Sequence, residues 1–260
     1  MFSDEHKLYL KKIRKQKHVI LFFKIFILLF FMILWEVCAK LEILNPFLTS
    51  YPSEIFLTIF DLFKENSLLT HIWVTLYETI ISFSLASLIG IGVASILWSN
   101  KTISKILDPY LTVLNSLPKI SLGPLIIIWI GANTNSIIFM ALLIAVFTTI
   151  IYMYNAFMNT DPYKITLMKS FGASKLQIFS KLIFRGNIRS LVNTLKINIS
   201  LSLIGVIMGE LLVSKQGLGY LITYGSQVFN LNLVITSIFI LGIMSYILYI
   251  LIDLLEKKLK

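Results

Sequence analysis

Two acidic residues, Glu78 and Glu210, lie in long apolar stretches of the sequence, where each is the only formal charge. A carboxylate in hydrocarbon costs a few kcal/mol and normally faces other protein groups or a water-filled cavity. We therefore expect these acids to line a translocation path or to lock helices together. The alternative is that each lies near the outer headgroups, since each stands close to one end of its stretch.

Other residue types that carry chemistry are too scattered to form a site. His6, His18 and His71 lack the i, i+4 spacing with which two imidazoles share a metal, and Cys38 is the only cysteine. The sequence also has no Gly-x4-Gly-Lys-Ser/Thr loop to cradle phosphates. We predict a transport chain that is not an enzyme, uses no cofactor or metal, and takes any energy from a partner.

Residues 161–190 form a basic loop that contains signals for the start and the end of a helix. Asp161-Pro162 is typical of a helix start, and Phe171-Gly172-Ala173-Ser174 is a break. A second amphipathic helix then follows, with Lys175 and Arg185 among its cations. A basic interfacial loop that only sets orientation would have a similar composition. The length of this loop and its helix start and stop signals favour a segment that docks onto a partner.

The composition places these residues in an all-α integral membrane protein. Hydrophobic residues make up 57% of the 260 positions, charged residues only 14%, and mean hydropathy is +0.85. A crossing needs about 20 mostly apolar residues. The charge-free run 120–160 is too long for one crossing, and Gly131 to Asn135 offer a turn. Six crossings are predicted, in residues 19–39, 72–98, 106–130, 134–160, 197–213 and 231–252.

The positions of Lys and Arg predict the orientation. They gather before the first crossing, after the second, in residues 161–190 and at the C-terminus. Because cationic loops stay in the cytoplasm, both termini are expected there. Orientation also accounts for the net charge of +10, so no nucleic-acid partner is expected. A cleaved signal peptide over the first 39 residues is disfavoured because Glu36 stands where small neutral residues are preferred.

Small residues recur at a spacing of four in two of the crossings. Ser82, Ala86, Gly90 and Ala94 form one series, and Gly205 and Gly209 form another. Such residues let helix backbones approach closely in a membrane. Pro118, with other Pro and Gly residues in 106–130, is expected to kink that crossing.

The chain divides into four expected segments with no internal repeat. Residues 1–18 are a cytoplasmic basic segment, and 19–39 are a peripheral first crossing. Residues 40–71 are an extracytoplasmic loop with a short interfacial helix that Ser53 would cap. Residues 72–260 are a five-helix core that contains the cytoplasmic loop 161–190.

Several short motifs, in this order and spacing, resemble the permease subunit of binding-protein-dependent ABC importers of the nitrate, sulfonate and taurine type. The resemblance covers most of the chain. In that family the cytoplasmic loop carries Glu-Ala-Ala-x3-Gly, and its glycine aligns with Gly172, whereas Thr166-Leu167-Met168 replace Glu-Ala-Ala and Phe184-Arg185 replace Leu-Pro. The other matching pieces are Leu117-Pro118-Lys119-Ile120, Trp129-Ile130-Gly131, Gly209-Glu210-Leu211-Leu212 and Gly217-Leu218-Gly219-Tyr220.

The resemblance implies an importer subunit in the bacterial inner membrane. Two permease chains, either two copies of this chain or this chain and a different permease, would form a pair. The pair would bind two cytoplasmic ATPase subunits and an extracytoplasmic solute-binding protein. The ATPase-coupling residues it implies are Lys169, Ser170, Phe171, Gly172, Ala173, Ser174, Lys175 and Phe179. The residues expected along the path or in helix packing are Glu78, Gly90, Pro118, Gly205, Gly209 and Glu210.

The resemblance offers nitrate, sulfonates, taurine, bicarbonate or pyrimidine precursors as solutes, and it does not choose among them. The departures at Thr166 and Arg185 affect the expected contact with the ATPase more than they affect the fold. An ATP-independent carrier or channel is the alternative function, and the two classes differ in whether the chain binds an ATPase.

Overall fold

The computed structural model describes residues 4–43, 45 and 49–259, and all the regular elements in these ranges are helical. The all-α fold expected from the composition is therefore confirmed for the described residues. The elements are α1 Asp4–Lys40, α3 Pro52–Lys64, α4 Leu68–Ser99, α5 Lys101–Ser116, η1 Lys119–Leu122, α6 Gly123–Ile130, α7 Thr134–Met158, α8 Pro162–Ser170, α9 Lys175–Ile178, η2 Phe179–Phe184, α10 Ile188–Val213, α11 Leu218–Gln227 and α12 Leu231–Leu259.

Five described helices are long and apolar enough to cross a membrane: α1, α4, α7, α10 and α12. The predicted sixth crossing, residues 106–130, is not one helix. It consists of α5 followed by η1 and α6, and the two parts are bent by 83°. The break falls at Leu117-Pro118, because the residue before a proline is driven into extended geometry (Leu117 φ −62°, ψ 140°). The predicted total is reached if this bent pair counts as one crossing.

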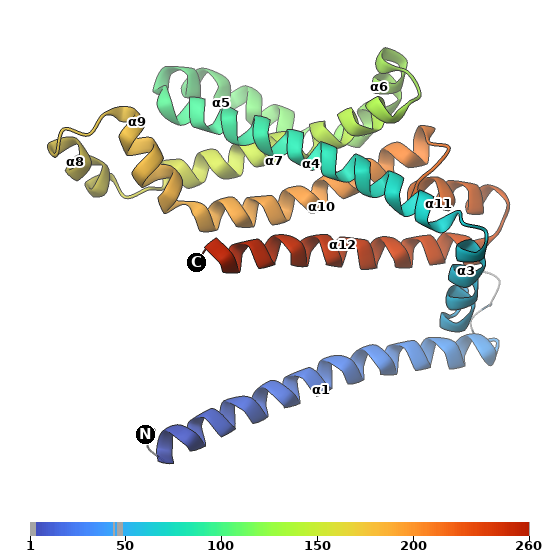
Figure 1. The fold of residues 1–260 in the computed structure, drawn as a ribbon. Coiled ribbons are helices and arrows are strands. Elements are labelled where there is room, and N and C mark those ends of the chain that lie inside the picture. The colour runs from blue at the N-terminus through green and yellow to red at the C-terminus, as the bar shows by residue number, and fades with distance from the viewer. Residues whose placement is uncertain (1–3, 44, 46–48, 260) are drawn as a thin grey trace.

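Helix α1 stands apart from the other spans (Figure 1). Its apolar window has no buried residue. The described contacts that hold it come from the start of α3, where Trp35 Nε1 donates to the Ser50 carbonyl at 3.2 Å and Ser53 Oγ donates to Glu36 Oε1 at 2.8 Å. The expected N-cap role of Ser53 is wrong: Tyr51 is the N-cap residue, Pro52 follows it, and Ser53 is inside the helix.

The core of the bundle is formed by α4, α7 and α10, with α12 alongside α10 (Figure 1). The predicted turn lies between α6 and α7, with Gly131 at φ +96° and the Asn133 side chain accepting from the backbone N–H groups of Asn135 and Ser136. Helices α8 and α9, the N-terminus and the C-terminus all lie at one end of the molecule (Figure 1). Helices α3, α6 and α11 lie at the other end.

Glycines bring the helices of the core into backbone contact. A Cβ atom at Gly205 of α10 would lie 2.5 Å from the Ala141 Cα of α7, and one at Gly90 of α4 would lie 2.6 Å from the Thr149 side chain. A Cβ at Gly209 would lie 2.9 Å from Ile137. These approaches are closer than any larger residue permits, so the small residues set the spacing of α4, α7 and α10.

We expect Gly205→Ala to destabilise the bundle and Gly92→Ala to leave it intact. The Gly205 methyl group would meet the α7 backbone, which cannot move aside without separating the helices, and such overpacking costs about 1–3 kcal/mol. A Cβ at Gly92 has no atom within 4 Å. Thermal unfolding of the protein in detergent tests this difference, and equal midpoints for the two variants would contradict it.

Candidate functional site

The loop between α7 and α10 begins with α8, whose two ends are fixed by local hydrogen bonds. The Asp161 side chain accepts from the Tyr163 backbone N–H at 2.9 Å, and Pro162 occupies the first turn. At the other end, the Gly172 N–H donates to the Lys169 carbonyl at 2.9 Å and the Ala173 N–H donates to the Met168 carbonyl at 3.0 Å. This pair of bonds is a Schellman motif, and it requires the left-handed φ of +74° found at Gly172. The predicted helix start and break are confirmed.

The second helix of the loop starts at a capping box. The Ser174 side chain accepts from the Gln177 N–H, and the Gln177 side chain accepts from the Ser174 N–H at 2.8 Å. The helix is not the uniform amphipathic helix that the sequence predicted. Four residues of α9 pass directly into the π-helix η2, Phe179–Phe184. Helix α10 then begins at Ile188.

One face of this segment is anchored in the membrane spans. Ile178 (3% exposed) and Ile183 (0%) pack in one apolar cluster with Ala94 of α4 and with Met153 and Phe157 of α7. The ring of Phe179 lies among those of Trp98, Phe157 and Phe184, with centroids 5.2, 5.5 and 6.2 Å away. Phe179, which was expected among the coupling residues, is partly buried and packs against these rings.

The other face of the loop exposes large apolar side chains. Tyr163 is 83% exposed, Phe171 79%, Leu176 76% and Leu167 56%. They lie on α8, on the turn and on α9, outside every candidate span. Lys169, Ser170 and Ser174 are exposed beside them. Large apolar side chains exposed outside the spans are typical of a surface that contacts another protein or the membrane.

A single side chain also joins the loop to the end of α4. The Lys175 ammonium donates to the backbone carbonyl of Ser99, which is the last residue of that helix. Carbonyls at a helix C-terminus lack intrahelical partners and carry partial negative charge, so a cation is favourable there. The loop is therefore fastened to α4 by a polar contact as well as by its apolar core.

At the opposite end of the molecule, Glu210 holds the start of α11. Its two carboxylate oxygens accept from Thr75 Oγ1 and from the Gly219 N–H, each at 2.6 Å. Thr75 Oγ1 in turn accepts from the Leu218 N–H at 2.8 Å. The first free N–H groups of α11 are thus satisfied by side chains of α10 and α4, and the carboxylate lies at the positive end of the helix dipole.

Gly217 and Gly219 leave the space that Glu210 occupies. A Cβ atom at Gly217 would lie 2.3 Å from the Glu210 carboxyl, and one at Gly219 would lie 2.7 Å from its Cβ. Gly217 also has φ +112°, and its N–H donates to His71 Nδ1 at 3.0 Å. The sequence showed the Gly-Leu-Gly motif and Glu210, but it gave no sign that His71 and Thr75 complete their network.

Glu78 lies beside this network and differs from Glu210 in its bonding. Its side chain lies near the Glu210 carboxyl and Thr134, yet neither of its oxygens makes a well-formed hydrogen bond to a described residue. Both acids are only 1% exposed. Two adjacent buried carboxyls repel each other when both are charged. Glu210 is thus fixed by two short hydrogen bonds, whereas Glu78 has no comparable bond to a described residue.

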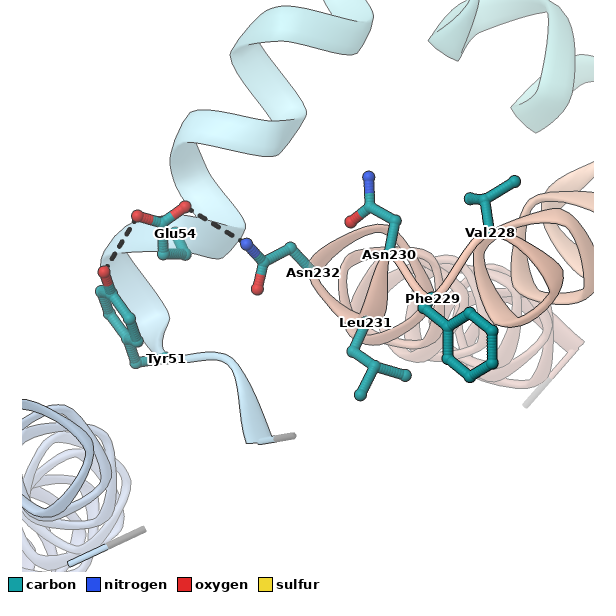
Figure 2. Close-up of a pocket in the computed structure, with 7 residues that line it drawn as sticks. All are labelled: Tyr51, Glu54, Val228, Phe229, Asn230, Leu231 and Asn232. Atoms are coloured by element: carbon teal, nitrogen blue, oxygen red, sulfur yellow. Dashed lines mark hydrogen bonds between the residues drawn. The ribbon is translucent and has the colours of Figure 1, made fainter. Parts of the chain in front are cut away.

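A cavity of about 440 Å³ lies at the same end as α11. Tyr51 and Glu54 line one side of it and residues 228–232 line the other (Figure 2). The Tyr51 hydroxyl donates to Glu54 Oε1 at 2.9 Å, and Asn232 Nδ2 donates to Glu54 Oε2 at 3.4 Å. The bond to the carboxylate raises the pKa of Tyr51. Glu54 thereby joins α3 to the start of α12.

The two acids should respond differently to substitution. Glu210→Ala leaves the Gly219 N–H buried without a partner, which costs about 1–3 kcal/mol, and it should lower the unfolding midpoint in detergent. Glu78→Gln keeps the size of a side chain whose oxygens have no hydrogen-bond partner among the described residues, so it should change the midpoint little. A larger loss for Glu78→Gln than for Glu210→Ala would contradict the role of Glu210 in holding α11.

Comparison with known proteins shows which family the sequence matches. Residues 86–260 match the family described as "Binding-protein-dependent transport system inner membrane component". The chain is 28% identical over 231 residues to the formylaminopyrimidine transport permease protein of Halalkalibacterium halodurans, covering 89% of this chain and 92% of that protein. It is 25% identical over 226 residues to a putative aliphatic sulfonates transport permease protein of Bacillus subtilis, covering 87% and 82% respectively.

The fold is also found among solved structures. An inward-facing structure of the MetNI methionine ABC transporter contains a chain that superposes with a TM-score of 0.67 at 21% identity, covering 74% of this chain and 96% of that one. The helices that carry the anchored loop and the Glu210 network fall within the residues that match the family, apart from the first part of α4. The chain belongs to the family of inner membrane components of binding-protein-dependent transport systems.

Proposed function

We propose that this chain is one of two membrane subunits of an ABC importer, and that its loop 161–190 binds a cytoplasmic ATPase. The observation that carries the proposal is the two-sided loop. One side is buried against α4 and α7 through Ile178 and Ile183, and the other presents Tyr163, Phe171 and Leu176 beyond the spans. A partner bound to the exposed side would move the loop, and the loop would move the ends of α4 and α7.

The proposed transport step is a rocking of the spans that is driven from this loop. ATP binding would bring the two ATPase subunits together and draw the loops of two permease copies toward each other. Because the loop contacts α4 and α7 through a packed core, its displacement passes to both helices. The translocation path would then open toward the exterior. ATP hydrolysis on the partner subunits would return it to the inward-open state.

Thr166-Leu167-Met168 stand where the family has Glu-Ala-Ala. This difference is consistent with a contact between the loop and the ATPase that is apolar instead of polar. Thr166 Oγ1 donates within its own helix to the Pro162 carbonyl at 3.0 Å. Leu167 is exposed and Met168 packs against the anchored cluster. We propose that Leu167 and Tyr163 supply by apolar burial what a glutamate supplies by a polar contact.

The proposed orientation puts the loop and both termini in the cytoplasm. These three features share one end of the molecule (Figure 1), and the basic segments of the sequence belong to that end. The division into a basic segment 1–18, a peripheral crossing 19–39, an external loop 40–71 and a core 72–260 follows from this orientation. The end with α3 and α11 would receive the solute-binding protein.

The proposed cargo is a small polar organic solute. The relatives named above carry out transport of formylaminopyrimidine and aliphatic sulfonates according to their names, and a further relative is a taurine transport permease protein of Escherichia coli, 22% identical over 231 residues. A carrier driven by a proton gradient would need a titratable group on a solvated path. Glu78 and Glu210 do not provide one, because both are enclosed by helices.

Two substitutions at Gly172 test whether the shape of the loop matters for coupling. A Cβ there would meet no atom within 4 Å, so the constraint is the left-handed backbone and not space. Gly172→Val should reduce ATP-driven uptake by about tenfold, as expected from a conformational cost of about 1–2 kcal/mol. Gly172→Asn, whose side chain tolerates this backbone, should retain most of the uptake. Equal uptake by both variants, at matched expression, would mean that the conformation of the turn has no effect on coupling.

A photo-crosslinker at Ser174 tests the partner. The side chain is exposed next to Leu176, so irradiation in native membranes should link it to a polypeptide that contains a nucleotide-binding P-loop, as identified by mass spectrometry. The same crosslinker at Phe229, which is 73% exposed at the opposite end, should not capture that polypeptide. Capture of the ATPase from Phe229 alone would reverse the proposed orientation.

A further inference from the structure

A large cavity lies between the loop and the ends of α4 and α7, beside the apolar cluster that anchors the loop. Its volume is about 900 Å³, and it is bounded by the end of α4, the start of α5, the end of α7, and α8 and α9. Lys101, Lys169 and Lys175 line it from three different elements. Lys169 and Lys175 also belong to the loop that the proposed function assigns to the ATPase, but the cavity itself has no role in that proposal.

The charges around this cavity are unbalanced. None of the residues that line it is acidic. Among the ion pairs of the described residues, none includes Lys101, Lys169 or Lys175. The Lys175 ammonium bonds the Ser99 carbonyl, which uses one of its three donors. Three cations around one cavity repel one another unless an anion lies between them.

The wall of the cavity that faces the spans is apolar. Leu97 and Trp98 at the end of α4 and Phe157 and Met158 at the end of α7 contribute to it. The cavity therefore lies where two membrane helices end, and both apolar side chains and lysines line it. This combination matches a molecule with a negative headgroup and acyl chains.

We propose that this cavity binds the phosphate headgroup of an anionic phospholipid. The acyl chains would follow the outer surfaces of α4 and α7, and the phosphate would lie among Lys101, Lys169 and Lys175. Basic pockets between membrane helices on the cytoplasmic side bind anionic headgroups in this way. Because Lys169 and Lys175 belong to the loop and Lys101 follows α4, the lipid would bridge the loop and the spans.

Native mass spectrometry of the detergent-purified chain tests the site with two probes, phosphatidylglycerol and zwitterionic phosphatidylethanolamine. We expect phosphatidylglycerol to bind about tenfold or more tightly than phosphatidylethanolamine, since lysines attract a headgroup with a net negative charge. The triple variant K101Q/K169Q/K175Q should lose this preference. The variant K101R/K169R/K175R should keep it.

A matched control removes the same charge elsewhere on the same end. Lys105, Lys164 and Lys181 are also exposed there, and none of them lines the cavity. K105Q/K164Q/K181Q should retain the preference for phosphatidylglycerol. Unfolding midpoints of all three variants show whether each one is folded, and a loss of binding counts only at an unchanged midpoint. Equal loss in both glutamine variants would mean a diffuse charge effect and would overturn the site.

Two further outcomes would also overturn the proposal. Saturation by inorganic phosphate with no gain from acyl chains would assign the cavity to a soluble anion. Loss of the bound lipid on assembly with the ATPase would assign the three lysines to the protein interface. None of these measurements involves transport, so failure of the lipid site leaves the proposed function untouched, and failure of uptake leaves the lipid site untouched.

Discussion

The burial of Ile178 and Ile183 against α4 and α7 is the contact on which the rest of the account depends. Fully burying such side chains stabilises a structure by about 1.5–3 kcal/mol each. The loop 161–190 would otherwise be a basic, amphipathic segment free to lie anywhere along the headgroups. Because Ala94, Met153 and Phe157 hold Ile178 and Ile183 in place, the exposed residues Tyr163, Phe171 and Leu176 are fixed relative to the ends of α4 and α7.

A second constraint keeps the spans close enough to act as one body. Gly205 and Gly209 bring α10 against α7, and Gly90 brings α4 against α7, at separations that no larger residue allows. At the opposite end, Glu210 ties α10 to α4 and α11 through hydrogen bonds to Thr75 and Gly219. A displacement that enters at the loop is thus carried by a bundle whose helices are fixed at both ends.

The sequence predicts local features of this chain better than it predicts contacts between distant segments. The turn at Gly131, the start of α8 at Asp161 and its end at Gly172 were all identified, because each depends on a backbone angle or a cap encoded by neighbouring residues. Ser53 was misassigned because its hydroxyl bonds Glu36, which lies 17 residues away. The partners of Glu210 were missed for the same reason. The 83° bend of α5 against α6 was foreseen only as a kink at Pro118, since its size depends on packing.

A reversible link between the loop and α4 tests whether the two move together during transport. In a Cys38→Ser background, Ser99→Cys and Lys175→Cys would be joined by a short reducible bifunctional methanethiosulfonate, and ATP-driven uptake would be measured in proteoliposomes with the ATPase and the binding protein present. These two residues are already in contact, so we predict the same uptake with the link closed and after reduction. Uptake that stops on closing the link and returns on reduction would mean that the loop moves independently of α4, which contradicts the account.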